Sequence, residues 1–271
     1  TPVVSGGHER KDTTWRWGVP VAAGAVGGRG TPDLGAAAFL ADNAHRLGAA
    51  CSAAAAARSN GRPGQTSPKQ RQSLDASAQA PATPVVAVGA STVGPAAVQT
   101  FLSGLPADCP PIVVAQNMPT TTARALADHL NSICHIAIAE AGHVRPLRPG
   151  QALIAPSGIH TLVAMRGGRC VTELKDGPPV SRHKPSVDVL FQSTARAVGA
   201  NAIGVILTGM GDDGALGLHE MRAAGARTIG QDEATSIVYG MPTAAFERGA
   251  VQCPAPLETI AALVLTPARA L

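Results

Sequence analysis

The sequence predicts an α/β fold that is doubly wound, with a mostly parallel sheet and helices on both faces. From residue 84 onward, short apolar runs alternate with segments of helical character, and the loops between them are short. This alternation is typical of a parallel sheet with right-handed crossovers. The runs are rich in β-branched residues, as expected of strands buried on both faces. Apolar residues make up 45% of the 271-residue chain, which is enough for a sizeable core.

The first strand is predicted at residues 85–88 and the first helix at residues 96–102. Pro95 supports this boundary, because proline is favoured at the first position of a helix. Ser91 and Thr92 therefore lie between a strand and a helix, where open α/β sheets bind ligands and perform chemistry. A serine beside the free N–H groups of a helix N-terminus is a candidate nucleophile or anion ligand. The alternative is an ordinary turn of small residues.

The turn sequence Gly89-x-Ser91-x-x-Gly94 differs from three known functional loops. Val93 stands where the nucleophile elbow has its second glycine. The Gly-Lys-Ser/Thr of a P-loop is missing, and Ser91 replaces the middle glycine of the dinucleotide fingerprint. The turn alone therefore does not decide the function.

The rest of the chain continues the alternation of strands and helices. Further strands are predicted at 112–115, 136–138, 152–155, 203–207 and 228–229, and a hairpin at Gly167-Gly168 joins 162–165 to 170–172. Helices are predicted through 123–130, 189–197, 216–221 and 257–265, the first capped by Thr120 or Thr121 and the second by Ser186.

Composition and charge narrow the classes of function. The net charge is only +4 and the basic residues are scattered, so nucleic-acid binding is not indicated, whereas an acidic protein partner would fit. The five cysteines lie far apart without a C-x-x-C pair, which favours reduced thiols in the cytoplasm over a disulfide framework or a zinc site. No apolar run reaches transmembrane length, so we expect no membrane insertion.

The beginning of the chain differs in composition from the rest. Residues 1–58 hold too little apolar sequence to bury a core of their own. Residues 59–82 are rich in Ser, Gln, Pro and Gly, which is typical of a linker. We therefore expect the α/β domain to occupy residues 83–271.

Polar residues follow three of the predicted strands, and Ser91, Asn117 and Asp213 are among them. In a parallel sheet the carboxyl ends of these strands meet at one edge. A serine hydrolase needs a nucleophile, a base beside it and a carboxylate that orients the base. Ser91 and Asp213 meet the first and third needs, but Asn117 is not a base. Asp213 also suits the N-cap of the helix that follows it.

Four motifs, in this order, resemble those of the protein-glutamate methylesterases of bacterial chemotaxis, the CheB type. They are VGAST at 88–92, QNMP at 116–119, GPPVSRHKPSVDVLF at 177–191 and LTGMGDDGA at 207–215. The resemblance covers roughly residues 83–265 and implies a cytoplasmic serine hydrolase that needs no metal or organic cofactor. Its implied reactions are removal of methyl groups from glutamate esters on methyl-accepting chemotaxis receptors and deamidation of receptor glutamines. A chemotaxis histidine kinase array is the implied wider partner.

The resemblance also assigns roles to single residues. Ser91 is the expected nucleophile, and Asp213 is expected to orient the base. Thr92 and the loop at Met210 are expected near the oxyanion. Two departures follow: Asn117 stands where the family has its general-base histidine, and Val93 stands where glycine is usual, so it could crowd the loop. We therefore expect reduced activity.

Three alternatives remain open. His160 or His183 could replace the missing base. The chain could bind a receptor without turning over its esters, as Asn117 would favour. It could also bind a nucleotide through residues 89–94, although no acidic residue for a ribose follows the second strand.

Members of this family that act as response regulators carry a receiver domain before the esterase. Residues 1–58 loosely resemble the last third of a receiver, with Thr31 where a receiver lysine is expected and without the phosphoacceptor aspartate. We therefore expect this segment to accept no phosphoryl group and to be poorly ordered.

Overall fold

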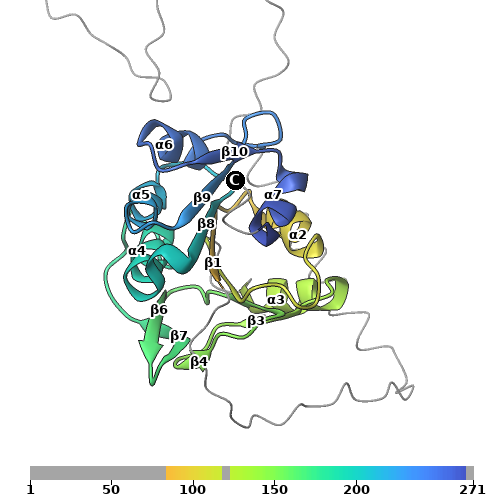
Figure 1. Cartoon of the computed structure of the whole chain (residues 1–271), viewed down its shortest axis with the longest axis vertical. Coiled ribbons are helices and arrows are strands. Elements are labelled where there is room, and N and C mark those ends of the chain that lie inside the picture. The colour runs from red at the N-terminus through yellow and green to blue at the C-terminus, as the bar shows by residue number, and fades with distance from the viewer. Residues whose placement is uncertain (1–83, 118–122, 267–271) are drawn as a thin grey trace, which may run out of the picture.

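The computed structural model describes residues 84–117 and 123–266, which form one α/β unit around a seven-stranded sheet (Figure 1). The strands follow the order β10-β9-β8-β1-β2-β5-β3, and all neighbouring pairs are parallel. The predicted parallel sheet is therefore confirmed. Its strands are β1 (Val85–Ala90), β2 (Ile112–Gln116), β3 (Ala137–Glu140), β5 (Gln151–Ile154), β8 (Ala202–Ile206), β9 (Arg227–Gln231) and β10 (Cys253–Ala255).

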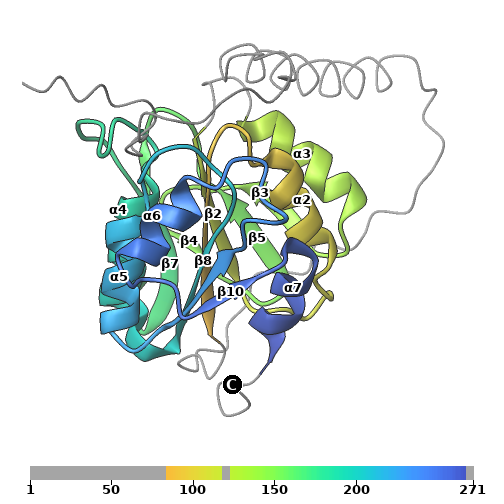
Figure 2. The same ribbon diagram turned by 90° about the horizontal axis from the view of Figure 1, so that it is seen from above.

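Helices cover both faces of the sheet, which confirms the doubly wound arrangement (Figure 2). One face carries α2 (Pro95–Ser103), α3 (Ala123–Ile133) and α7 (Leu257–Leu265). The other carries α4 (Val187–Val198), α5 (Ala215–Ala223) and α6 (Met241–Glu247), and a short 3-10 turn, η1 (Gly199–Asn201), follows α4. Alternate residues of β1 serve the two cores, with Val86 and Val88 on the first side and Ala87 on the second.

Gly89 sets how closely α4 approaches β1. A Cβ atom built on Gly89 would lie 2.2 Å from Val187 Cγ1 and 3.1 Å from Phe191 Cζ. Any larger residue would therefore push the start of α4 away from the strand. This matters for the site described below, because the first turn of α4 carries three of its hydrogen-bond donors.

A smaller antiparallel sheet lies against the outside of α4. It contains β4 (Arg145–Pro146), β6 (His160–Arg166) and β7 (Arg169–Lys175), in the order β4-β7-β6. Gly167 and Gly168 join β6 to β7 with φ angles of 55° and 77°, which confirms the predicted hairpin. Ser193 Oγ of α4 accepts a hydrogen bond from Val163 N of β6 at 3.0 Å, so the ribbon is fixed to the helix.

Several predicted features are confirmed, and others need correction or lie outside the described residues. Pro95 begins α2, and Ser186 caps α4 by accepting from Val189 N. The sequence did not predict α6, β4 or β10. The proposed caps Thr120 and Thr121, together with residues 1–58 and 59–82, lie outside the described residues.

In the part of the chain that the structure describes, no helix combines the length and apolar character needed to cross a bilayer.

The close contact at Gly89 predicts a large effect of one methyl group. Gly89→Ala should lower the free energy of unfolding by about 1–3 kcal/mol, because overpacking forces α4 to shift. Gly142→Ala is the matched control, since its Cβ would have no neighbour nearer than Arg145 Cβ at 3.9 Å. It should change the free energy by less than about 0.5 kcal/mol. Urea unfolding followed by circular dichroism tests both, and equal stability of Gly89→Ala and the parent would contradict the packing.

Candidate active site

Ser91, Asn117 and Asp213 lie at the carboxyl edge of three adjacent strands. Ser91 follows β1, Asn117 follows β2, and Asp213 lies in the loop after β8. β1 runs between the other two strands, and Ala90 pairs with Gln116 in the parallel register. All three side chains are buried. The sequence prediction that these residues share one edge is therefore confirmed.

The turn after β1 is tied to the end of β2 by three hydrogen bonds. Asn117 N donates to Ala90 O at 3.2 Å, and Gln116 Nε2 donates to Ser91 O at 3.2 Å. Thr92 Oγ1 donates to Asn117 O at 2.9 Å. The backbone of Ser91 is therefore fixed relative to Asn117, and the Thr92 hydroxyl serves this connection.

Val93 fits into this turn without disrupting it. Its side chain is buried, and Gly94 N still donates to Ser91 O at 2.8 Å, which closes the turn before α2. Gly94 leaves no room for a side chain, because a Cβ there would lie 2.8 Å from Ala90 Cβ. The expected crowding by Val93 is therefore not seen.

Gly209 brings the loop after β8 into contact with the serine. A Cβ on Gly209 would lie 2.6 Å from Ser91 Cβ and 2.3 Å from Met241 Sδ. Gly209 O accepts from Gly240 N and Met241 N, so the start of α6 holds the loop in place. Met210 follows directly and is 46% exposed. The loop at Met210, which the family resemblance placed near the oxyanion, therefore lies beside Ser91.

The carboxylate of Asp213 is held by the N-terminus of α4. Ser186 Oγ and Asp188 N donate to Oδ1 at 2.8 and 3.0 Å, and Val187 N donates to Oδ2 at 2.9 Å. A helix N-terminus favours an anion, because its first N–H groups lack partners within the helix. Asp213 does not cap the helix that follows it, as the sequence indicated, because Gly214 with a φ of 97° holds that position. The carboxylate binds a different helix.

The side chain of Asn117 reaches the carboxylate of Asp213. Its Nδ2 donates to Asp213 Oδ2 at 3.4 Å, whereas its Oδ1 is buried without a hydrogen-bond partner among the described residues. An amide can donate to the carboxylate as an imidazole would. It cannot take a proton from a serine hydroxyl at neutral pH, because it is not basic.

A second carboxylate, Asp188, lies beside Asp213 and was not singled out from the sequence. Its Oδ1 accepts from Gly217 N at 2.8 Å and its Oδ2 from Ser181 Oγ at 3.1 Å. Burial raises the pKa of Asp188, and the nearby charge of Asp213 acts in the same direction. The available signal in the sequence was its position in the first turn of a helix. An acidic residue at that position usually marks a helix N-terminus and does not by itself indicate a functional site.

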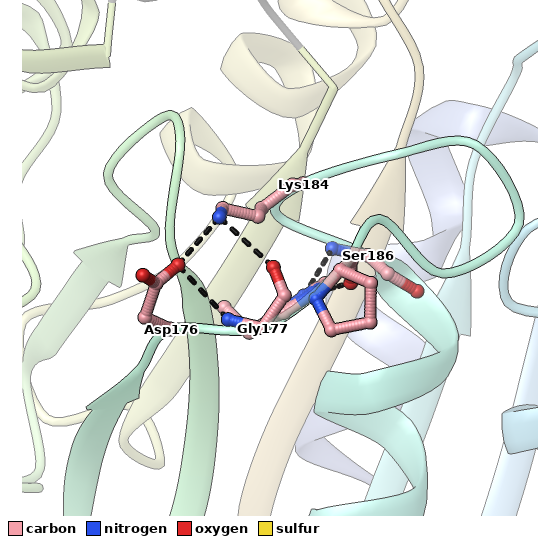
Figure 3. A network of polar contacts seen from close by, with 6 residues as sticks. Asp176, Gly177, Lys184 and Ser186 are labelled. Carbon is pink, nitrogen blue, oxygen red and sulfur yellow. Dashed lines mark hydrogen bonds and ion pairs between the residues drawn. The ribbon is translucent and has the colours of Figure 1, made fainter.

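His160 is committed to structure rather than available as a base. Its Nδ1 lies 3.2 Å from Ser186 N and its Nε2 lies 3.0 Å from Pro178 O. Because an amide N–H only donates and a carbonyl only accepts, Nδ1 accepts from Ser186 N and Nε2 donates to Pro178 O. His160 therefore supports the segment that caps α4, as does the network around Asp176, Gly177, Lys184 and Ser186 (Figure 3). His183 contributes its backbone to a turn with Val180.

No group of three or more His, Cys, Asp or Glu side chains that could hold a metal ion occurs within residues 84–117 and 123–266.

Comparison with known proteins agrees with this arrangement. The model of the family "CheB methylesterase" matches residues 86–264. This chain belongs to the CheB methylesterase family. A protein-glutamate methylesterase/protein-glutamine glutaminase of Geobacter metallireducens is 58% identical over 181 residues, which cover 67% of this chain and 51% of the relative. One from Xanthomonas euvesicatoria is 46% identical over 259 residues, which cover 91% of this chain and 74% of that protein.

A solved structure shares the fold of this CheB-family chain. The catalytic domain of Thermotoga maritima CheB methylesterase matches with a TM-score of 0.66 and 31% identity, covering 68% of this chain and 98% of that domain. This chain spans about half the length of the Geobacter relative and three quarters of the Xanthomonas one.

The hydrogen bonds at Asp213 predict that its carboxylate cannot be replaced by an amide. Asp213→Asn should lower the free energy of unfolding by about 1–3 kcal/mol, because four donors then share one oxygen and N–H groups lose their acceptor. Asp212, the exposed neighbour, provides the control. Asp212→Asn should change the free energy of unfolding by less than about 0.5 kcal/mol. Chemical denaturation measures both. If the two variants are equally stable, the hydrogen bonds at Asp213 do not hold α4.

Proposed function

We propose that this chain is a serine hydrolase that demethylates glutamate methyl esters and deamidates glutamines on chemoreceptors, with activity reduced by Asn117. The observation that carries this proposal is the contact from Asn117 to Asp213 beside Ser91, in a chain of the CheB methylesterase family. Ser91 is the nucleophile. Asp213 orients the residue at position 117. The names of the Geobacter and Xanthomonas relatives support both reactions.

The reaction is acyl transfer through Ser91. The Ser91 oxygen forms a bond to the carbonyl carbon of the glutamyl ester, and methanol leaves. Water then attacks the acyl-enzyme, which releases the glutamate carboxylate and restores the serine. Backbone N–H groups at Thr92 and Met210 are the proposed stabilisers of the oxyanion, because both positions adjoin Ser91 in the fold.

Proton transfer is the weak step of this mechanism. Asn117 keeps the contact with Asp213 but does not remove the proton from Ser91 Oγ, so that proton must pass to water. Losing one member of a triad typically lowers the rate on the order of 10⁴–10⁶-fold. Oxyanion stabilisation and substrate binding supply the rate enhancement that remains.

A non-catalytic, receptor-binding member of the same fold is the second candidate. The observation that favours it is Asn117 itself, whose buried Oδ1 has no partner among the described residues. Under this alternative the fold and the surface around Ser91 persist for binding, and turnover is absent.

The wider setting is also part of the proposal. Residues 83–271 form the catalytic domain, residues 1–58 are a receiver-like remnant, and residues 59–82 are the linker. The protein works in the cytoplasm on methyl-accepting receptors, and a chemotaxis histidine kinase array joins it to signalling. Neither a metal nor an organic cofactor takes part.

Methanol release from methylated chemoreceptor membranes tests the proposed function. The parent chain should release methanol slightly faster than the Ser91→Ala blank. Asn117→His should raise the rate on the order of 10⁴–10⁶-fold, which is the usual cost of losing one member of a triad. The double variant Asn117→His with Ser91→Ala controls for release that does not pass through the serine.

The other outcomes separate the two candidates. A parent chain as inactive as the blank, together with an active Asn117→His, would favour the non-catalytic alternative. If Asn117→His also equals the blank, the esterase assignment of this site is wrong.

A further inference from the structure

The turn at residues 180–183, called here the Arg182 turn, has an unusual backbone. It lies between β7 and α4 and closes with hydrogen bonds from Val180 N to His183 O at 3.1 Å and from His183 N to Val180 O at 2.9 Å. Its central residues, Ser181 and Arg182, have φ angles of 50° and 67°. Two successive left-handed residues usually include asparagine and glycine, because a Cβ disfavours this region. Surrounding contacts must therefore hold the turn in place.

Those contacts lead directly to the candidate site. Ser181 Oγ donates to Asp188 Oδ2 at 3.1 Å, and Asp188 N donates to Asp213 Oδ1 at 3.0 Å. Asp188 is buried, and its other oxygen accepts from Gly217 N at the start of α5. The Arg182 turn is thus fixed to the Asp213 carboxylate through two hydrogen bonds, and it occupies a defined position beside the site.

The charges in this segment differ in their availability. Lys184 Nζ contacts Asp176 Oδ1 at 2.5 Å and Gly177 O at 2.9 Å, so its charge is balanced within the loop (Figure 3). Arg182 is exposed, and no other described residue pairs with its guanidinium group. Val180 beside it is 37% exposed. The turn therefore presents to solvent one apolar side chain and one cation that has no partner within residues 84–117 and 123–266.

We propose that the Arg182 turn docks an acidic segment of the protein substrate, adjacent to the glutamyl side chain that reaches Ser91. The inference rests on the proposed function, in which the reacting group is part of a protein. A guanidinium group binds carboxylates through paired N–H donors. Because the backbone of the turn is fixed before binding, little ordering is needed when the partner arrives. Val180 adds apolar contact area beside the ion pair.

Binding of the full chain to methylated chemoreceptor membranes, measured by co-sedimentation, tests this docking. Arg182→Gln should weaken binding about two- to fivefold, as expected for one exposed ion pair, and Arg182→Glu should weaken it further. Added salt should weaken the parent more than Arg182→Gln. The control is Arg169→Gln, because Arg169 is an exposed arginine at the far tip of the β6–β7 ribbon, and it should bind like the parent.

The outcomes distinguish the docking from the proposed function. Equal binding by the parent, Arg182→Gln and Arg182→Glu would overturn the docking and leave the receptor function intact. A parent that does not bind receptor membranes, although a fluorophosphonate still labels Ser91, would overturn both. Weakening by Arg169→Gln as large as that by Arg182→Gln would also overturn the docking, since general charge would then explain the binding.

Discussion

The carboxylate of Asp213 at the N-terminus of α4 is the interaction on which the geometry of the site depends. Three donors from the first turn of α4 and its cap bind this carboxylate, and Asn117 Nδ2 donates to it as well. The helix can supply these donors only because Gly89 lets it approach β1 closely. Packing in the core and chemistry at the edge of the sheet are therefore coupled. A change that moves α4 also moves Asp213, the residue at position 117 and, through Asp188, the Arg182 turn.

Much of the fold follows from local signals in the sequence. Apolar runs marked the longer strands, Pro95 and Ser186 marked helix starts, and Gly167-Gly168 marked the hairpin. The shared position of Ser91, Asn117 and Asp213 followed from one rule, since parallel strands end at one edge. α6 and β10 were missed because elements of seven and three residues carry too little periodicity. The partner of Asp213 was missed because local pattern favours a cap on the next helix, whereas the true partner lies 25–27 residues away in sequence.

The side chain of Asn117 keeps the arrangement of the site but does not act as a base. The side-chain amide keeps the hydrogen bond to Asp213, and Asn117 O accepts a hydrogen bond from the Thr92 hydroxyl. The framework around Ser91 therefore remains assembled. Under the proposed function, what the amide does not supply is a proton acceptor of suitable basicity. His160 does not offer a replacement, because both of its ring nitrogens are hydrogen-bonded to the backbone of the loop that precedes α4. Under the proposed function, this framework turns over slowly because oxyanion stabilisation and binding act without a general base.

The dependence on pH of the rate at which a fluorophosphonate labels Ser91 tests the absence of a general base most directly. If water and hydroxide are the only proton acceptors, the labelling rate of the parent chain should rise steadily from about pH 5.5 to 9. Asn117→His should introduce an inflection near the usual pKa of histidine, about 6.5. An inflection of that kind in the parent chain would contradict this picture, because it would mean that another imidazole already serves Ser91.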